Sequence, residues 1–273
     1  MDLHLANLYT LSFEYKHLLR VIMYRAGNPA LTDSTFDKNA YNNINWWENE
    51  SSNKMTIEGV SEKTAFLLII TATAAIATAM TMPESSILYI LGFVLSIILA
   101  LVIAFKQSTN PILISTYAVF EGFLLGGFTW HWENMTGTPG LGLLAALITF
   151  LILAVMITIY RLGLIHWDKN MQIAITSAVF AIMILYVISL IGFFVGFEVP
   201  IIHDSTPLGI AFSFFVVGIA TLTLVADFDF IERGVLQGAP KQLEWRAAFG
   251  LLVSLAWLYF EIVRLLGKII LRD

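Results

Sequence analysis

Long apolar runs alternate with short polar breaks from Lys63 to the end of the chain. Seven runs cover residues 65–82, 87–105, 111–132, 141–160, 173–197, 208–230 and 247–271. Each has about the twenty residues that a helix needs to cross a hydrocarbon layer of ~30 Å. An open strand cannot satisfy its backbone groups in lipid. The pattern therefore predicts an all-α, polytopic membrane protein, a bundle of seven transmembrane helices.

The segment before these runs is polar and contains turn residues such as Gly27-Asn28-Pro29. We therefore expect two parts, a polar tail over residues 1–61 and a seven-helix membrane domain over residues 62–273. Within the tail, residues 8–25 could form a short interfacial helix. Alternatively, the natural chain starts at Met23, and the sequence leaves both interpretations open.

Composition supports a membrane protein and excludes several functional classes. The chain is 58% hydrophobic and only 13% charged, whereas a soluble domain has about 25% charged residues. A net charge of −5 argues against a nucleic-acid partner, since phosphates are neutralised by clustered Lys and Arg. The absence of cysteine excludes disulfides and thiolate chemistry. The chain also lacks a His-Glu-x-x-His motif and a Gly-x-Ser-x-Gly motif, so we predict neither an enzyme nor a cofactor.

The charges of the breaks predict an orientation. One alternate set of loops is basic, with Lys54, Lys63, Lys106, Arg161, Lys169, Arg233, Lys241 and Arg246. The other set is acidic, with Glu84, Glu133, Glu198 and Asp204. Because basic loops stay in the cytoplasm, we expect a multi-pass protein of the cell (inner) membrane with its N-terminus cytoplasmic and its C-terminus outside.

Ionisable groups inside the runs are the candidate functional residues, because a charge in the membrane is costly unless it has a role or a partner. Asp227 and Asp229 lie two residues apart, so they point in different directions on a helix. Asp229 and Arg233 are four residues apart near the cytoplasmic end, which favours a solvated salt bridge over a functional site. Asp227 is deeper and is the better candidate for facing the bundle.

Glu261 in the last run has two possible partners. Arg264, three residues later, could neutralise it. Alternatively, Glu261 faces Asp227 on the neighbouring helix, and the two carboxylates share a proton and act as a pH-dependent gate. Glu121 in the third run lies beside Gly122 and either bonds to a neighbouring helix or lines a path.

Several segments resemble the transmembrane Bax inhibitor motif family, which includes Bax inhibitor-1, and in particular its bacterial branch with a polar N-terminal tail. The resemblance covers residues 26–268. The segments that carry it are Phe120-Glu121-Gly122, Asp227 at the end of the sixth run, Phe228-Asp229-Phe230-Ile231-Glu232-Arg233-Gly234, Gly238-Ala239-Pro240-Lys241, and Leu258-Tyr259-Phe260-Glu261-Ile262-Val263-Arg264-Leu265-Leu266.

The resemblance implies a seven-helix fold whose last helix is enclosed by the others. It also implies a pH-sensitive calcium leak controlled by paired carboxylates on the sixth and seventh helices. Asp227 matches the first carboxylate and Glu261 the second, where relatives carry Asp; these two would also contact a transient calcium ion. A basic partner near the cytoplasmic end of the second helix is expected as well, and Lys106 is the residue available there.

An alternative function is a non-conducting membrane protein that regulates a protein partner, such as a membrane protease or a stress-response factor. The polar tail and residues 232–246 would offer the contact surface. A retinal protein is disfavoured because Lys268 lies near the outer end of the last run rather than at its centre. Besides the lipid bilayer, the sequence identifies neither a partner nor an oligomeric state.

Overall fold

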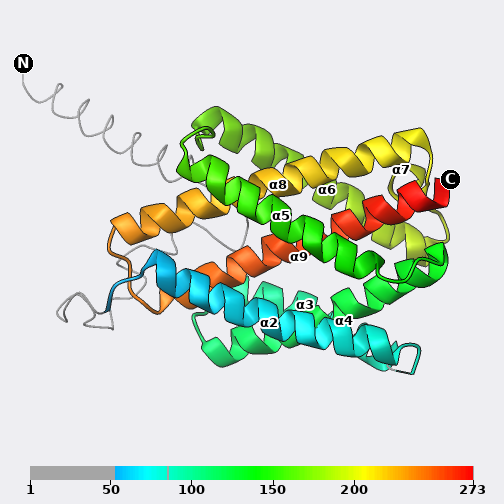
Figure 1. The fold of residues 1–273 in the computed structure, drawn as a ribbon, viewed down its shortest axis with the longest axis horizontal. Helices are drawn as coiled ribbons and strands as arrows, with labels where there is room; N and C mark the ends of the chain where they lie inside the picture. Colours follow the sequence, from blue (N-terminus) through cyan, green and yellow to red (C-terminus); the bar gives the residue numbers. More distant parts are fainter. Residues whose placement is uncertain (1–52, 85, 273) are drawn as a thin grey trace, which may run out of the picture.

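The computed structural model describes residues 53–84 and 86–272, which form seven long helices and one short one (Figure 1). The helices are α2 Ile57–Thr81, α3 Ser86–Phe105, α4 Pro111–Thr136, α5 Leu141–Arg161, α6 Lys169–Val195, α7 Pro200–His203, α8 Pro207–Leu236 and α9 Leu243–Arg272. The seven long helices are long and apolar enough to cross a membrane. The predicted all-helical fold is confirmed, whereas the predicted interfacial helix at residues 8–25 lies outside the described residues.

Several helices extend beyond the apolar runs that predicted them. α2 begins at Ile57, eight residues before its run, because the Thr56 hydroxyl accepts a hydrogen bond from the Gly59 amide and caps the helix. The predicted boundary between residues 61 and 62 therefore falls inside α2. α8 and α9 also continue past their apolar runs toward each other. Hydropathy marks the part of a helix that suits hydrocarbon, whereas capping decides where the helix begins or ends.

The last helix lies at the centre of the bundle. α9 contacts α2, α4, α5 and α8, and in Figure 1 it runs through the middle of the molecule in orange and red. This confirms the enclosed last helix. α2 and α9 begin at one end of the bundle and finish at the other, and we call these the N-terminal end and the C-terminal end.

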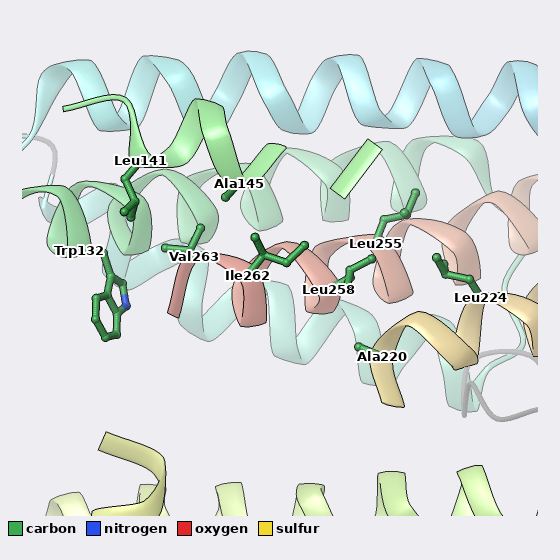
Figure 2. Close-up of a cluster of buried hydrophobic side chains, with 9 residues drawn as sticks. All are labelled: Trp132, Leu141, Ala145, Ala220, Leu224, Leu255, Leu258, Ile262 and Val263. Carbon is green, nitrogen blue, oxygen red and sulfur yellow. The ribbon is translucent and has the colours of Figure 1, made fainter. Parts of the chain in front are cut away.

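The apolar core surrounds α9. Leu258 and Val263 are fully buried, and Leu224 of α8 and Ala145 of α5 pack into the same cluster (Figure 2). In contrast, many large apolar side chains on the other helices face outward; Met80 is 81% exposed. Such a surface suits lipid as the surrounding medium.

α2 and α4 pack closely through small residues. A Cβ atom at Gly122 would overlap the Thr71 carbonyl, and one at Gly126 would overlap the Ala75 carbonyl. Backbones approach this closely only where side chains are small, as is typical of helix pairs in membranes. This contact holds α4, and with it Glu121, against the rest of the bundle.

Candidate functional site on the central helix

Most of the buried charged side chains in the described part of the chain lie on α9, together with Ser254 and the partly exposed Arg264. We call them the α9 polar series, and they are Glu244, Arg246, Ser254, Glu261, Arg264 and Lys268. Except for Arg264, whose side chain is 17% exposed, each is buried. Ser254, Glu261 and Lys268 follow one another at intervals of seven residues, which places them on nearly the same face of the helix. Because buried polar groups require partners, the contacts of this series define the candidate site.

Asp227 lies fully buried on α8, in agreement with its expected position facing the bundle. The Ser254 hydroxyl of α9 donates a hydrogen bond to Asp227 Oδ2 at 2.5 Å. A hydroxyl can donate to a carboxylate or accept from a carboxylic acid. The contact between α8 and α9 therefore accommodates either protonation state of Asp227.

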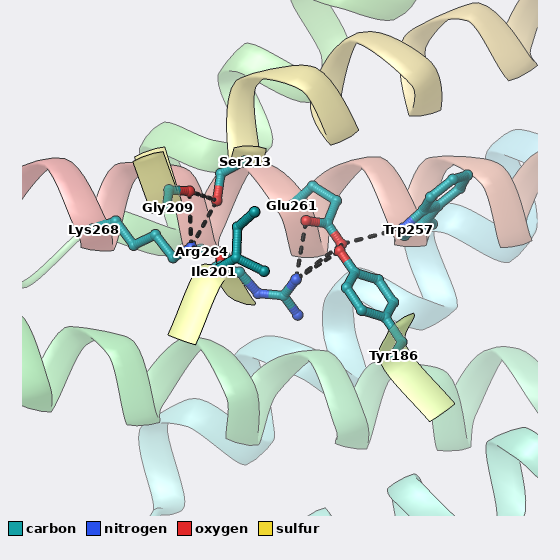
Figure 3. Close-up of polar contacts among 8 residues, drawn as sticks. All are labelled: Tyr186, Ile201, Gly209, Ser213, Trp257, Glu261, Arg264 and Lys268. Carbon is teal, nitrogen blue, oxygen red and sulfur yellow. Dashed lines mark hydrogen bonds and ion pairs between the residues drawn. The ribbon is translucent and has the colours of Figure 1, made fainter. Parts of the chain in front are cut away.

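Glu261 has a different set of partners (Figure 3). Arg264 Nη1 lies 3.1 Å from Glu261 Oε2, and the Tyr186 hydroxyl of α6 donates to Oε1 at 2.7 Å. The Trp257 indole donates to the same oxygen at 3.2 Å. Arg264 also donates to the Tyr186 hydroxyl at 2.8 Å, which closes a triangle of three side chains. Of the two interpretations from sequence, neutralisation by Arg264 is the one that these contacts support.

The two carboxylates therefore contact different levels of α9. Asp227 contacts Ser254, and Glu261 is seven residues farther along, which corresponds to about 10 Å of helix rise. In this conformation Asp227 is bonded to a hydroxyl, whereas Glu261 is ion-paired. Direct proton sharing between them stays a prediction, which requires a different arrangement of α8 and α9.

Glu121 is buried on α4 and accepts hydrogen bonds from the side chains of Tyr117 and Ser96. Ser96 belongs to α3, so Glu121 joins two neighbouring helices. This contact supports the first of its two sequence interpretations. It also places Glu121 in a polar contact separate from the α9 polar series.

Asp229 and Arg233 form the predicted pair, with Arg233 Nε 2.9 Å from Asp229 Oδ2. Their side chains are 22% and 30% exposed, and they lie toward the N-terminal end of the bundle. The expected salt bridge at a helix end is confirmed. Exposed pairs of this kind contribute little to stability, typically ~0–1 kcal/mol.

Lys106 lies exposed immediately after α3. The buried basic residue near that end of α3 is instead Arg246 of α9, which donates to the Ala104 carbonyl at 3.4 Å. From sequence alone Arg246 is expected in a loop, because it precedes the last apolar run. The extension of α9 back to Leu243 brings it into the bundle.

The burial of two further charged groups was not predicted from the sequence. Glu244 forms an ion pair with Lys63 of α2 and accepts a hydrogen bond from the Thr56 amide at 3.0 Å. Lys268 is fully buried near the C-terminal end. Its spacing of seven residues from Glu261 was a signal that could have indicated a shared face. No comparable signal links Glu244 to Lys63, because they are 181 residues apart.

An apolar cavity of about 410 Å³ lies between α2, α4, α5 and α9. Its few polar groups include the Thr129 and Tyr259 hydroxyls, which lie 2.7 Å apart, and neither Asp227 nor Glu261 lines it. Within residues 53–84 and 86–272, no three His, Asp or Glu side chains are grouped as a metal site would require.

Comparison with protein families gives a match to the family described as Bax inhibitor 1 like, over residues 28–270. Comparison with curated proteins gives no match. The family match covers the other six long helices in full, α9 up to residue 270, and every residue of the α9 polar series. The chain is therefore a multi-pass membrane protein that belongs to the Bax inhibitor 1-like family.

Proposed function

We propose that this protein is a pH-regulated passive cation leak, with calcium as the permeant ion and with Asp227 and Glu261 as its gating groups. The observation that carries the proposal is the burial of two carboxylates on the adjacent helices α8 and α9, inside a membrane-spanning bundle. Intramembrane carboxylates typically belong to ion or proton pathways. Family membership supports a membrane role without an enzymatic reaction.

Asp227 is the group that responds to pH in this proposal. When ionised, it attracts a cation to the contact between α8 and α9, and when protonated it loses that attraction. The Ser254 hydroxyl is a suitable partner because it can bond to both forms. Acidification therefore lowers the cation flux by removing the charge of Asp227.

Glu261 limits passage by its engagement with Arg264 and Tyr186. While these contacts persist, the positive charge of Arg264 offsets the carboxylate and reduces its attraction for a passing cation. Opening then requires α6, which carries Tyr186, to separate from α9 near Glu261. The two carboxylates thus act at different levels of one pathway, with Asp227 nearer the N-terminal end.

Calcium fits this arrangement as a transient ion. Carboxylate and hydroxyl oxygens are suitable ligands for a hard cation. A calcium storage site supplies about six to eight oxygens, many more than two carboxylates provide. The ion would therefore be weakly held and would keep much of its water, as passive conduction requires.

The test is calcium flux into proteoliposomes over a range of pH, with wild type, Asp227→Asn and Glu261→Gln compared. We expect Asp227→Asn to behave like the acidified wild type and to lose the pH response. Asp229→Asn is the matched control, because it makes the same change two residues away in a partly exposed ion pair. Unchanged flux and pH response in Asp227→Asn would contradict the proposal.

A second candidate, a non-conducting regulator of a protein partner, is favoured by a polar cavity at the N-terminal end. Its volume is about 790 Å³, and Lys63, Lys241 and Trp245 are among its lining residues. We propose that this end faces the cytoplasm, since the basic loops lie here. Site-specific cross-linking from Lys241 to one dominant protein, together with absence of calcium flux, would favour this function over the leak.

A further inference from the structure

Lys268 is a buried cation held by neutral oxygens near the C-terminal end of α9. Its ammonium donates to the Ser213 hydroxyl at 3.0 Å, the Gly209 carbonyl at 3.1 Å and the Ile201 carbonyl at 3.5 Å (Figure 3). Within the described residues 53–84 and 86–272, the hydrogen-bond partners of the ammonium are these three oxygens, and each of them is uncharged. A buried charge without an adjacent countercharge is costly, so its presence calls for an explanation.

The acidic groups around Lys268 compensate its charge only in part. Glu261, on the same face of α9, is already paired with Arg264. Asp204 follows α7 and is exposed, so water screens its charge. Arg264, one turn before Lys268, adds a second positive charge. The segment of α9 from Glu261 to Lys268 therefore contains two cations and one carboxylate.

The oxygens around the ammonium come from two segments at the C-terminal end of the bundle. Gly209 and Ser213 belong to the first turns of α8, and Ile201 belongs to the short helix α7. The ammonium thus connects α9 to both segments about 10 Å beyond Glu261 along the helix. Carbonyl and hydroxyl oxygens are also the ligand types that hard cations prefer. The ammonium occupies a cluster of oxygens that would otherwise attract a free cation.

We propose that Lys268 is a tethered internal cation that closes the C-terminal end of the bundle to passing cations. It does so by filling this oxygen cluster and by repelling positive charge on the route from Glu261 to the outside. The inference rests on the proposed leak function and adds a residue that restricts that leak.

The first experiment measures calcium flux into proteoliposomes at neutral pH. We expect Lys268→Met to raise the flux several-fold, because it removes the charge and keeps an unbranched side chain. Lys268→Arg keeps the charge and should raise the flux less than Lys268→Met does. Arg272→Gln removes an exposed charge one turn later and serves as the control. Wild-type flux in Lys268→Met, in a preparation where Asp227→Asn alters the flux, would overturn the inference but leave the proposed function standing.

A second experiment does not depend on calcium conduction. The chain contains no cysteine, so Ser213→Cys introduces a single thiol beside the ammonium. Labelling rates with cationic and anionic thiol reagents, added from the C-terminal side, are compared with and without Lys268→Met. Removing the ammonium should raise the ratio of cationic to anionic labelling about tenfold or more.

These two experiments separate the possible failures. If wild type and Lys268→Met both pass no calcium, the proposed leak function is wrong, and the labelling ratio decides the role of Lys268 by itself. An equal ratio in the two backgrounds, or no labelling in either, would overturn the inference. In that case the ammonium would not control a route that opens to solvent.

Discussion

The two buried carboxylates on α8 and α9 have contrasting surroundings. Asp227 is bonded to the hydroxyl of Ser254, whereas Glu261 is bonded to a guanidinium, a phenol and an indole. Both residues are buried: Asp227 is 0% exposed and Glu261 is 1% exposed. Burial alone therefore does not show which partner a carboxylate has, and the contacts of each must be known.

From this difference we expect separate tasks for the two residues. A buried ion pair is strongly destabilised when one partner is removed, because the remaining charge has no compensation. A carboxyl group bonded to a hydroxyl can change its protonation state and keep that bond. We therefore expect changes around Glu261 to affect stability most and changes around Asp227 to affect the pH response most.

The largest expected effect is that of Arg264→Met, which leaves Glu261 buried without its cation. We expect a loss of about 3 kcal/mol in the free energy of unfolding, at the low end for buried pairs because Arg264 is partly exposed. Thermal unfolding in detergent measures it, with Arg272→Gln as the control. The double variant Glu261→Gln with Arg264→Met should recover much of the loss, and strict additivity of the two changes would contradict the pairing.

Ser254→Ala should have the next largest effect, because it removes the hydroxyl that donates to buried Asp227. The proposed function requires Asp227 to be ionised at neutral pH; a hydrogen bond to a charged acceptor contributes about 1.5–3 kcal/mol, so we expect a loss in that range. Ser254→Thr keeps the hydroxyl and is the matched control. The pH dependence of calcium flux should also shift in Ser254→Ala. An unshifted profile would indicate that Ser254 has only a structural role.

Tyr186→Phe should destabilise by about 1–2 kcal/mol, less than Arg264→Met, because Arg264 still compensates the charge of Glu261. The same thermal unfolding assay measures the difference. In the Glu261→Gln background the effect of Tyr186→Phe should shrink, since the charged acceptor is gone. Equal effects in the two backgrounds would mean that the phenol acts independently of Glu261.

The smallest expected effect concerns His203 at the end of α7, whose Nε2 lies 2.8 Å from the Ser189 hydroxyl. Partial burial lowers the pKa of His203 below its usual value of 6.5, and the positive charges of Arg264 and Lys268 act in the same direction. Between the lowered pKa and 6.5, the unfolded chain binds more protons than the folded chain. The contribution of neutral His203 to the free energy of unfolding is therefore complete above pH 6.5. It is lost as the pH falls from 6.5 through the lowered pKa.

Replacing His203 by Gln should reduce this acid sensitivity, because Gln does not titrate and can still bond to Ser189. Melting temperatures at pH 7.5 and pH 5.5 provide the comparison. Wild type should lose slightly more on acidification than His203→Gln. If the variant loses as much as wild type, the imidazole does not contribute to the pH dependence of folding.

The seven long helices and the Asp229–Arg233 pair could be predicted from sequence because their causes are local. A helix that crosses a membrane requires about twenty consecutive apolar residues, and these are visible as runs. Residues four apart on a helix meet without any help from the rest of the fold. The Glu261–Arg264 pair was also visible as one of two alternatives, since the two residues are three apart.

The choice between those alternatives depended on the tertiary structure. Residues of α8 and α9 approach each other by packing, and packing places Ser254 opposite Asp227 while it leaves Glu261 two turns away. Packing also decides three other contacts that the sequence does not reveal. It brings Tyr186 of α6 to Glu261, Arg246 of α9 to the end of α3, and the oxygens of α7 and α8 to Lys268. Apolar runs determined by themselves that the chain forms helices in a membrane. The relative positions of those helices, which side-chain shape and close packing decide, determined which charge meets which partner.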